Sequence, residues 1–116
     1  MSNEPPYSRT REAGGLLLTA GILGTRGADL VPEPGAQIEA ALDNLQALLE
    51  REGAGLDDVV RLVVYLTDIA SMDLLNEAFT RRFAEPRPAR TTVEVSALPL
   101  GAAVELEATA ESAPAR

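Results

Sequence analysis

Arg90 is the residue of this sequence whose type and place most clearly suggest chemistry. It precedes the alternating run Thr-Thr-Val-Glu-Val, so it stands at the start of a predicted strand, on the face shared by Thr92 and Glu94. A guanidinium there can bind a carboxylate through two parallel hydrogen bonds, which a lysine cannot form. The alternative is an ion pair with Glu105 or Glu107, a common surface arrangement. Spacing alone leaves both interpretations open.

Glu105 and Glu107 provide a second candidate group. They stand two residues apart on the last predicted strand and therefore share one face. The predicted hairpin register brings one of them near Glu94, and facing carboxylates raise the pKa of one another. A carboxylate with a raised pKa can activate water as a general base. The alternative is a solvated acidic strand face, which is the commoner structure.

Three further residues carry weaker signals. Gly21 interrupts an apolar run, where a glycine marks either a bulge or the close approach of a ligand or backbone. Tyr7 follows two prolines and could be a binding aromatic or an anchor for the N-terminal segment. Asn76 lies one position off the buried stripe of a predicted helix, where we expect a structural amide. The glycines at 14–27 match neither GxGxxG nor GxxxxGK, the two glycine-rich motifs that bind nucleotide phosphates.

The composition excludes several classes of chemistry. The chain has no cysteine, histidine or lysine, which excludes disulfides, thiolate nucleophiles, Ser-His pairs and Schiff bases. We therefore expect any chemistry to come from carboxylates, arginines, hydroxyls, backbone groups and bound water. The net charge of -8 argues against a nucleic-acid partner and favours a small metabolite.

The length of 116 residues suits one domain over 1–116, with a core from about 7 to 110 and a frayed tail at 111–116. No apolar run is long enough to span a membrane. The N-terminal residues lack the pattern of a signal or transit peptide, so we expect a cytoplasmic protein without a membrane partner.

Hydrophobic periodicity places the elements of the first half. Residues 16–23 read as a strand buried on both faces, preceded by an edge strand at 9–13 that turns at two glycines. Residues 24–35 read as loop. An amphipathic helix is predicted over 36–52, and a strand with both faces covered over 57–67.

The second half continues with a helix that begins after Ser71 and stops before Pro86, its buried stripe formed by Met72, Leu75, Phe79 and Phe83. Alternation at 91–98 and 104–111 predicts two strands, which we expect to form a hairpin through residues 98–101.

The order β-β-α-β-α-β-β predicts an α+β fold, a mixed sheet with both helices on one face. Two helices cover only one side of a sheet, whereas the strands at 16–23 and 57–67 are apolar on both sides. Large exposed apolar patches are rare on monomers, so we expect the other face to be buried in an obligate oligomer.

The chain resembles the reactive intermediate deaminase family (Rid, YjgF or endoribonuclease L-PSP) over most of its length, from about residue 7 to 110. The segment 87–95 with the downstream Glu-x-Glu-Ala is the most specific part. The resemblance is carried by Tyr7-Ser8, Ala20-Gly21, residues 41–45, 56–60 and 64–68, Asn76-Glu77, residues 86–95, Leu98-Pro99 and residues 104–108.

The resemblance implies a chorismate-mutase-like homotrimer with ligand clefts at subunit interfaces. It also implies hydrolysis of 2-imino acids such as 2-aminoacrylate and 2-iminobutanoate to 2-oxo acids and ammonia, without a cofactor or metal. Arg90 would hold the substrate carboxylate and Glu105 would position water. The implied substrate-binding residues are Tyr7, Gly21, Asn76, Arg90 and Thr92.

This sequence departs from the family pattern around the implied cleft. It has Ala20-Gly21-Ile22 where Ser-Gly-Gln is usual, Arg9 where glutamine is common, and Thr92 where many members have cysteine. Two alternatives to the deaminase remain. One is a non-catalytic protein that binds 2-oxo acids or other carboxylates, and the other is a ribonuclease or translation inhibitor, against which the acidic charge and missing histidine argue.

Overall fold

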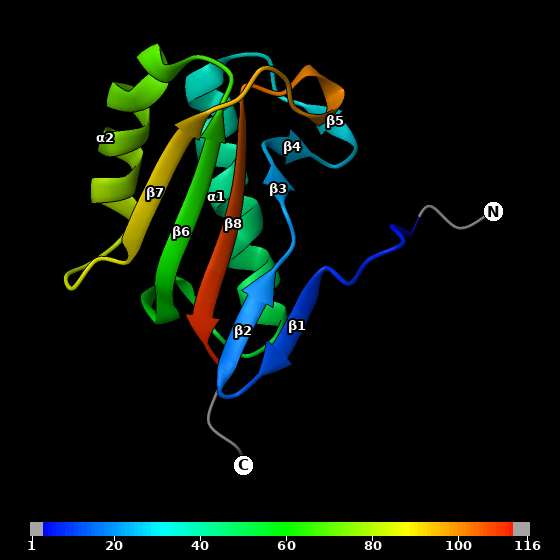
Figure 1. Ribbon diagram of the computed structural model, residues 1–116, viewed down its shortest axis with the longest axis vertical. Helices are drawn as coiled ribbons and strands as arrows, with labels where there is room; N and C mark the ends of the chain where they lie inside the picture. The colour runs from blue at the N-terminus through cyan, green and yellow to red at the C-terminus, as the bar shows by residue number, and fades with distance from the viewer. Residues whose placement is uncertain (1–3, 113–116) are drawn as a thin grey trace.

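A computed structural model of the chain describes residues 4–112 as a six-stranded mixed sheet with two helices on one face (Figure 1). The strands run in the order β1-β2-β8-β6-β7, and β3 pairs with β8 beside β2. The elements are β1 (Thr10–Ala13), β2 (Leu16–Thr19), β3 (Ile22–Leu23), β4 (Thr25–Arg26), β5 (Asp29–Leu30), α1 (Pro34–Arg51), β6 (Val59–Leu66), α2 (Met72–Arg82), β7 (Ala89–Glu94) and β8 (Val104–Glu111). The predicted α+β class with two helices is confirmed.

The predicted strand at 16–23 is in fact two strands. β2 ends at Thr19 and β3 begins at Ile22, so Ala20 and Gly21 form a break while both strands follow β8. Within one chain only one face of this segment is covered, and burial of the other face in an oligomer stays a prediction. Leu17 is buried, whereas Leu16 and Leu18 are 38% and 44% exposed. The side chains of β2 alternate between the two faces of the sheet, but the sequence does not show this because leucines occupy both faces.

The β1–β2 hairpin turns at Gly14 and Gly15, as predicted. Both residues have positive φ, 59° and 78°, which glycine adopts without a Cβ penalty and which suits a tight two-residue turn. The segment 24–35, expected to be loop, contains the short β4–β5 hairpin as well.

Helix α1 supplies most of the core. Its buried side chains fall at helical spacing, and Ile38, Leu42, Leu45 and Leu49 are at most 1% exposed. The helix begins at Pro34, where a missing N–H is harmless at the first turn, and Arg51 lies in the last turn. The prediction of 36–52 was therefore correct within two residues at each end.

The predicted start of helix α2 after Ser71 and its end before Pro86 are confirmed. It begins at Met72 after Ser71 and ends at Arg82. Leu75, Ala78 and Phe83 are buried, while Met72 and Phe79 are only half-buried at the margin of the stripe. That margin faces the edge strand β7, so these two side chains remain accessible to its residues.

The last third of the chain is not a hairpin. β6 lies between β7 and β8, pairing parallel with β7 and antiparallel with β8. The connection after β7 runs through a 3-10 turn at Pro99–Gly101 and returns to the far side of β6. Alternation had located the strands and their faces, but it does not specify which strand lies beside which.

In β6, as in β2, one face is covered within the chain. Residues 56–58 form a short 3-10 turn rather than strand, and β6 alternates: Leu62, Val64 and Leu66 are buried under the helices, and Val63 and Tyr65 are half-buried on the other face. That second face of the sheet is covered by no helix, as Figure 1 shows, and we call it the open face. The exposed leucines of β2 belong to it.

Two remaining features concern the ends and the surface. β8 extends to Glu111, and the N–H of Ser112 donates to the Gly15 carbonyl, so the predicted frayed tail does not begin at 111. The rest of that tail lies outside the described residues. Within 4–112, no helix has the length and apolarity needed to cross a lipid bilayer.

Candidate active site

Arg90 lies on the helix-covered face of the sheet. Its register partner on β6 is Leu62, whose side chain is fully buried beneath the helices. The Arg90 Nη2 donates to Asn76 Oδ1 at 2.7 Å and lies 3.5 Å from the Met72 sulfur, and its Cζ stands 4.8 Å from the centre of the Phe79 ring. Three side chains of α2 therefore fix the position of this guanidinium.

The Arg90 guanidinium forms no ion pair within residues 4–112. The alternative of a salt bridge with Glu105 or Glu107 across a hairpin was wrong, because that hairpin does not exist. Burial lowers the pKa of Arg90 from its usual value, yet a guanidinium remains charged at any physiological pH. A half-buried, positioned and unneutralised cation is suited to binding an anionic group.

Thr92 and Asn76 complete this first group. Thr92 follows Arg90 by two residues on β7 and so faces the same side. Its Oγ1 is buried and has no hydrogen-bond partner in the described part of the chain. Asn76, for which we expected a structural amide, binds Arg90 directly. We call Arg90, Asn76 and Thr92 the arginine group.

Glu105 lies on the open face, between the buried neighbours Val104 and Leu106. Burial raises the pKa of Glu105, and the negative charge of Glu107 raises it further. No side chain or N–H within 4–112 donates a hydrogen bond to its carboxylate. Glu94, expected beside it, accepts instead from the N–H of Ile69 on the far side of β6.

Gly21 is in direct contact with Glu105. A Cβ at Gly21 would stand 2.8 Å from Cδ of Glu105, which is closer than real Cβ contacts allow. Gly21 lies at the break between β2 and β3, and the group that approaches it is the Glu105 side chain rather than a backbone; approach of a ligand stays a prediction.

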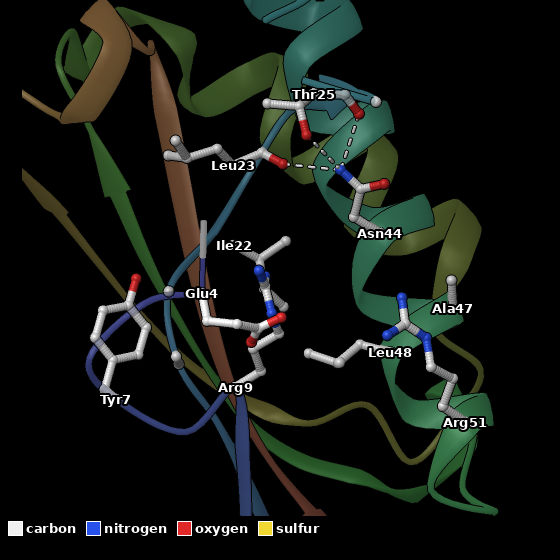
Figure 2. A pocket seen from close by; sticks show the side chains of 13 residues that line it. Glu4, Tyr7, Arg9, Ile22, Leu23, Thr25, Asn44, Ala47, Leu48 and Arg51 are labelled. Atoms are coloured by element: carbon white, nitrogen blue, oxygen red, sulfur yellow. Dashed lines mark hydrogen bonds between the residues drawn. The ribbon is translucent and has the colours of Figure 1, made fainter. Parts of the chain in front are cut away.

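Tyr7 lies near Gly21, since both line one cavity of about 630 Å³ between β3 and α1 (Figure 2). The tyrosine side chain is 60% exposed and stands on the opposite side of the 20–23 segment from the side chains of α1. We call Glu105, Gly21 and Tyr7 the glutamate group.

The structure thus divides the predicted site residues into two groups that one chain does not bring together. Residues level with each other across β8, β6 and β7 share a face, and Glu105, Tyr65 and Val93 form one such row on the open face. Arg90 points to the other face, and β6 lies between its strand and β8.

Sequence reasoning missed the residues that support these groups. Met72 and Phe79 were assigned to the core, although their place at the margin of the helical stripe could have identified them as contacts of an edge strand. Tyr65 donates a hydrogen bond to Glu107, and this bond raises the pKa of the tyrosine. The alternation of β6 places Tyr65 on the same face as Glu105. Only the pairing of β6 with β8 shows that Tyr65 contacts Glu107.

Glu105 is the only carboxylate of these two groups. Among residues 4–112, no cluster of three acidic side chains has the arrangement needed to hold a metal ion. The arrangement offers one anion-binding guanidinium, one carboxylate of raised pKa, and backbone groups at the 20–23 break.

Comparison with protein families matches residues 1–112 to the model of endoribonuclease L-PSP. A RutC family protein of Pyrococcus abyssi is 36% identical over an alignment of 113 positions, and the match covers 90% of this chain and 85% of that protein. Reactive Intermediate Deaminase A of Arabidopsis thaliana, a chloroplastic protein, is 36% identical over an alignment of 110 positions, and the match covers 88% of this chain and 56% of the relative.

Solved structures show the same fold. The crystal structure of RidA from the Antarctic bacterium Psychrobacter sp. PAMC 21119 has a TM-score of 0.89 and 36% identity, covering 95% of this chain and 91% of that one. The YjgF gene product of E. coli has a TM-score of 0.83 and 30% identity, covering 91% and 87%.

Proposed function

Because the chain belongs to the endoribonuclease L-PSP family, which has a relative named reactive intermediate deaminase, we propose that it hydrolyses 2-imino acids to 2-oxo acids and ammonia. The substrates are of the 2-aminoacrylate and 2-iminobutanoate type. Arg90 holds the substrate carboxylate, and Glu105 positions the attacking water. The active unit is a homotrimer with its clefts between subunits.

The observation that carries this proposal is the state of Arg90. Its guanidinium is held by Asn76 and Phe79, neither of which neutralises it, and it has no carboxylate partner within 4–112. Positioning by neutral groups keeps the charge available for a substrate carboxylate and fixes the imine carbon relative to the cleft.

Glu105 provides the second half of the mechanism. Its raised pKa and its lack of a donor make it a better proton acceptor than an ordinary surface glutamate. Water loses a proton to this carboxylate as its oxygen bonds to the imine carbon, and the protonated Glu105 returns that proton to the nitrogen. Collapse of the resulting carbinolamine breaks the C–N bond and releases ammonia and the 2-oxo acid.

The division into two groups explains why the active unit has more than one chain. Arg90 and Glu105 lie on opposite faces of one sheet, so a cleft containing both needs the arginine group of one copy and the glutamate group of another. Leu16 and Leu18 leave apolar surface exposed on the open face, and a second copy would bury it. Tyr7 closes this cleft, while Gly21 and Thr92 line it.

The experiment combines two inactive variants. Arg90→Ala and Glu105→Gln chains, carrying different tags, are co-produced, and hydrolysis of freshly generated 2-iminobutanoate is followed by semicarbazide trapping. Each variant alone is expected to be inactive. Random mixed trimers regain about one quarter of wild-type activity, because each mixed ring rebuilds one of its three clefts.

Two results would overturn different parts of the proposal. If wild-type protein does not accelerate hydrolysis of the imine, the deaminase is wrong. If the wild type is active but doubly tagged assemblies stay inactive, the sharing of the cleft between copies is wrong.

The same geometry favours one second candidate, a carboxylate-binding protein without catalysis. Arg90 would bind a 2-oxo acid whether or not Glu105 acts on water. Calorimetry with 2-oxobutanoate separates the two: tight binding that is lost in Arg90→Ala, together with no imine turnover, establishes the binding protein instead.

A further inference from the structure

Met72 holds the one sulfur atom within residues 4–112. The chain has no cysteine, and its other methionine is Met1, which lies outside the described residues. A thioether is readily oxidised to a sulfoxide, which converts an apolar group into a polar one. Oxidants that act on sulfur therefore have a single target in the described part of the chain.

The Met72 sulfur lies against the Arg90 guanidinium. It stands 3.5 Å from Arg90 Nη2, the same nitrogen that donates to Asn76 Oδ1 at 2.7 Å. An Nη2 group has two N–H bonds, and its partners here are one strong acceptor, the amide oxygen, and one weak acceptor, the thioether. A carboxylate oxygen easily replaces the weak acceptor, which leaves Arg90 able to bind an anion through two hydrogen bonds.

Met72 is within reach of small solutes. It begins α2 and is half-buried at the margin that faces β7, and Asn76 on the next turn is exposed. An opening that admits a carboxylic acid to Arg90 Nη2 also admits hydrogen peroxide, which is smaller and uncharged. The sulfur and the anion-binding guanidinium therefore share one approach.

We propose that Met72 is an oxidation site that controls anion binding by Arg90. Hydrogen peroxide transfers one oxygen atom to the sulfur: the O–O bond breaks, an S–O bond forms, the sulfur gives up two electrons, and the remaining oxygen leaves as water. The sulfoxide oxygen is a strong acceptor, so it retains the Arg90 N–H that the thioether leaves available. Methionine sulfoxide reductases reverse the step. The consequence for a substrate carboxylate rests on the proposed function of Arg90.

The test treats the wild-type protein with hydrogen peroxide. Peptide mass spectrometry measures the fraction of Met72 that carries an added oxygen atom. Calorimetry with 2-oxobutanoate is expected to show a dissociation constant about ten-fold higher after oxidation, because a hydrogen bond from Arg90 to the anion is lost. Incubation with methionine sulfoxide reductase and dithiothreitol should restore the untreated value.

A second measurement reports the contact without any ligand. The side-chain Nε–H signal of Arg90 in ¹⁵N spectra is assigned by its disappearance in Arg90→Ala, and oxidation of Met72 is expected to shift it. This signal separates the oxidation site from the proposed function. If the untreated protein does not bind 2-oxobutanoate, the carboxylate-binding role of Arg90 fails, and the shift still decides whether the sulfoxide contacts Arg90.

Variants assign the effect to one sulfur. Met72→Leu keeps a similar apolar volume but cannot be oxidised there, so peroxide should leave its dissociation constant at that variant's own untreated value. The matched control is the double variant Met72→Leu/Leu74→Met, which moves the thioether to a 45% exposed position of the same helix. Its oxidation should change neither the Arg90 signal nor the binding. Met1 is present in both proteins, so they also report any effect of its oxidation.

Four results would overturn the oxidation site. The first is a Met72 that stays unmodified at a peroxide concentration that fully oxidises the thioether of the double variant. The second is complete oxidation of Met72 with an unshifted Arg90 signal or, where the wild type binds 2-oxobutanoate, an unchanged dissociation constant. The third is equal weakening of binding in Met72→Leu. The fourth is loss of the α2 backbone amide signals on oxidation, which would show that the sulfoxide unfolds the helix instead.

Discussion

The two charged groups of the candidate active site are held in opposite ways. The Arg90 guanidinium has partners on three sides, all of them neutral and all from α2. The Glu105 carboxylate has no hydrogen-bond donor within 4–112, is half-buried, and lies beside the like charge of Glu107. The first environment fixes a charge in place, and the second disfavours one.

This difference matches two different tasks. A group that binds a substrate anion benefits from a fixed position and a permanent charge. A group that takes a proton from water benefits from a carboxylate whose charged form is less stable than usual, because its pKa then lies nearer the working pH. The predictions below test this contrast, from the largest expected effect to the smallest.

Removal of the guanidinium should have the largest effect. Arg90→Ala deletes two charge-assisted hydrogen bonds to the substrate carboxylate, so kcat/KM for 2-iminobutanoate is expected to fall about 1,000-fold. The matched control is Arg11→Ala, an exposed arginine of β1, which should retain wild-type kcat/KM. Activity that survives Arg90→Ala contradicts the role of the arginine group.

Removal of the carboxylate charge comes next. Glu105→Gln keeps the size of the side chain but cannot accept a proton, and kcat is expected to fall about 100-fold. The wild-type rate should decline as pH falls through the raised pKa of Glu105, since only the deprotonated form acts as base. A pH-independent wild-type rate over the acid range would show that no carboxylate of raised pKa takes part.

The two close-packed glycines allow a paired test. Gly21→Ala brings a Cβ against the Glu105 side chain, which can swing away, so we expect about ten-fold lower kcat with an unchanged melting temperature. In Gly24→Ala the Cβ meets the Gln37 backbone, with its carbonyl carbon at 2.7 Å, so stability should fall instead. Equal loss of stability in both would remove Gly21 from the site.

Asn76→Ala tests the positioning of Arg90. The substitution removes the hydrogen bond at 2.7 Å but leaves the guanidinium and the Phe79 contact, so KM should rise about five-fold with little change in kcat. Glu77→Ala, at the next position of the same exposed helix surface, serves as control. A selective fall in kcat would instead place Asn76 at the reacting atoms.

The smallest expected effect is a displacement of the pH profile. Glu107→Gln removes the charge that raises the pKa of Glu105 while keeping an acceptor for Tyr65, so the acid limb of kcat/KM should move to lower pH. Burial still raises this pKa, so the limb should remain above that of an ordinary glutamate. Glu111→Gln, at the end of the same strand, should leave the profile in place.

Alternation and helical spacing of apolar residues predicted most of the helices and strands. The alternation of β8 and the amphipathic spacing of α1 predicted these two elements, because the hydrophobic period determines the face on which a side chain lies. The hydrophobic period does not determine which strands pair with each other. The hairpin prediction failed since β6 and β7 form a parallel pair joined by α2, and only the tertiary structure shows that β6 lies between them.

The prediction of the candidate site from the sequence was limited in the same way. Residue types pointed to Arg90 and Glu105, and alternation placed Thr92 beside Arg90 and Glu107 beside Glu105. Their location on opposite faces follows from the core, because it depends on which face of β7 and of β8 the helices cover. Arg51 was noted only for the helix dipole, and its place across a cavity from Arg9 depends on how α1 packs beside the N-terminal segment.

The position of β8 has a consequence for how the protein is made. This strand pairs with β6 on one side and with β2 and β3 on the other, and its partners in β2 and β3 lie more than half the chain away in sequence. During synthesis, the first 100 or so residues leave the ribosome without the strand that joins the N-terminal hairpin to β6. Contacts this distant in sequence make folding slow, so the nascent chain exposes the edges of β2 and β6 until β8 has emerged.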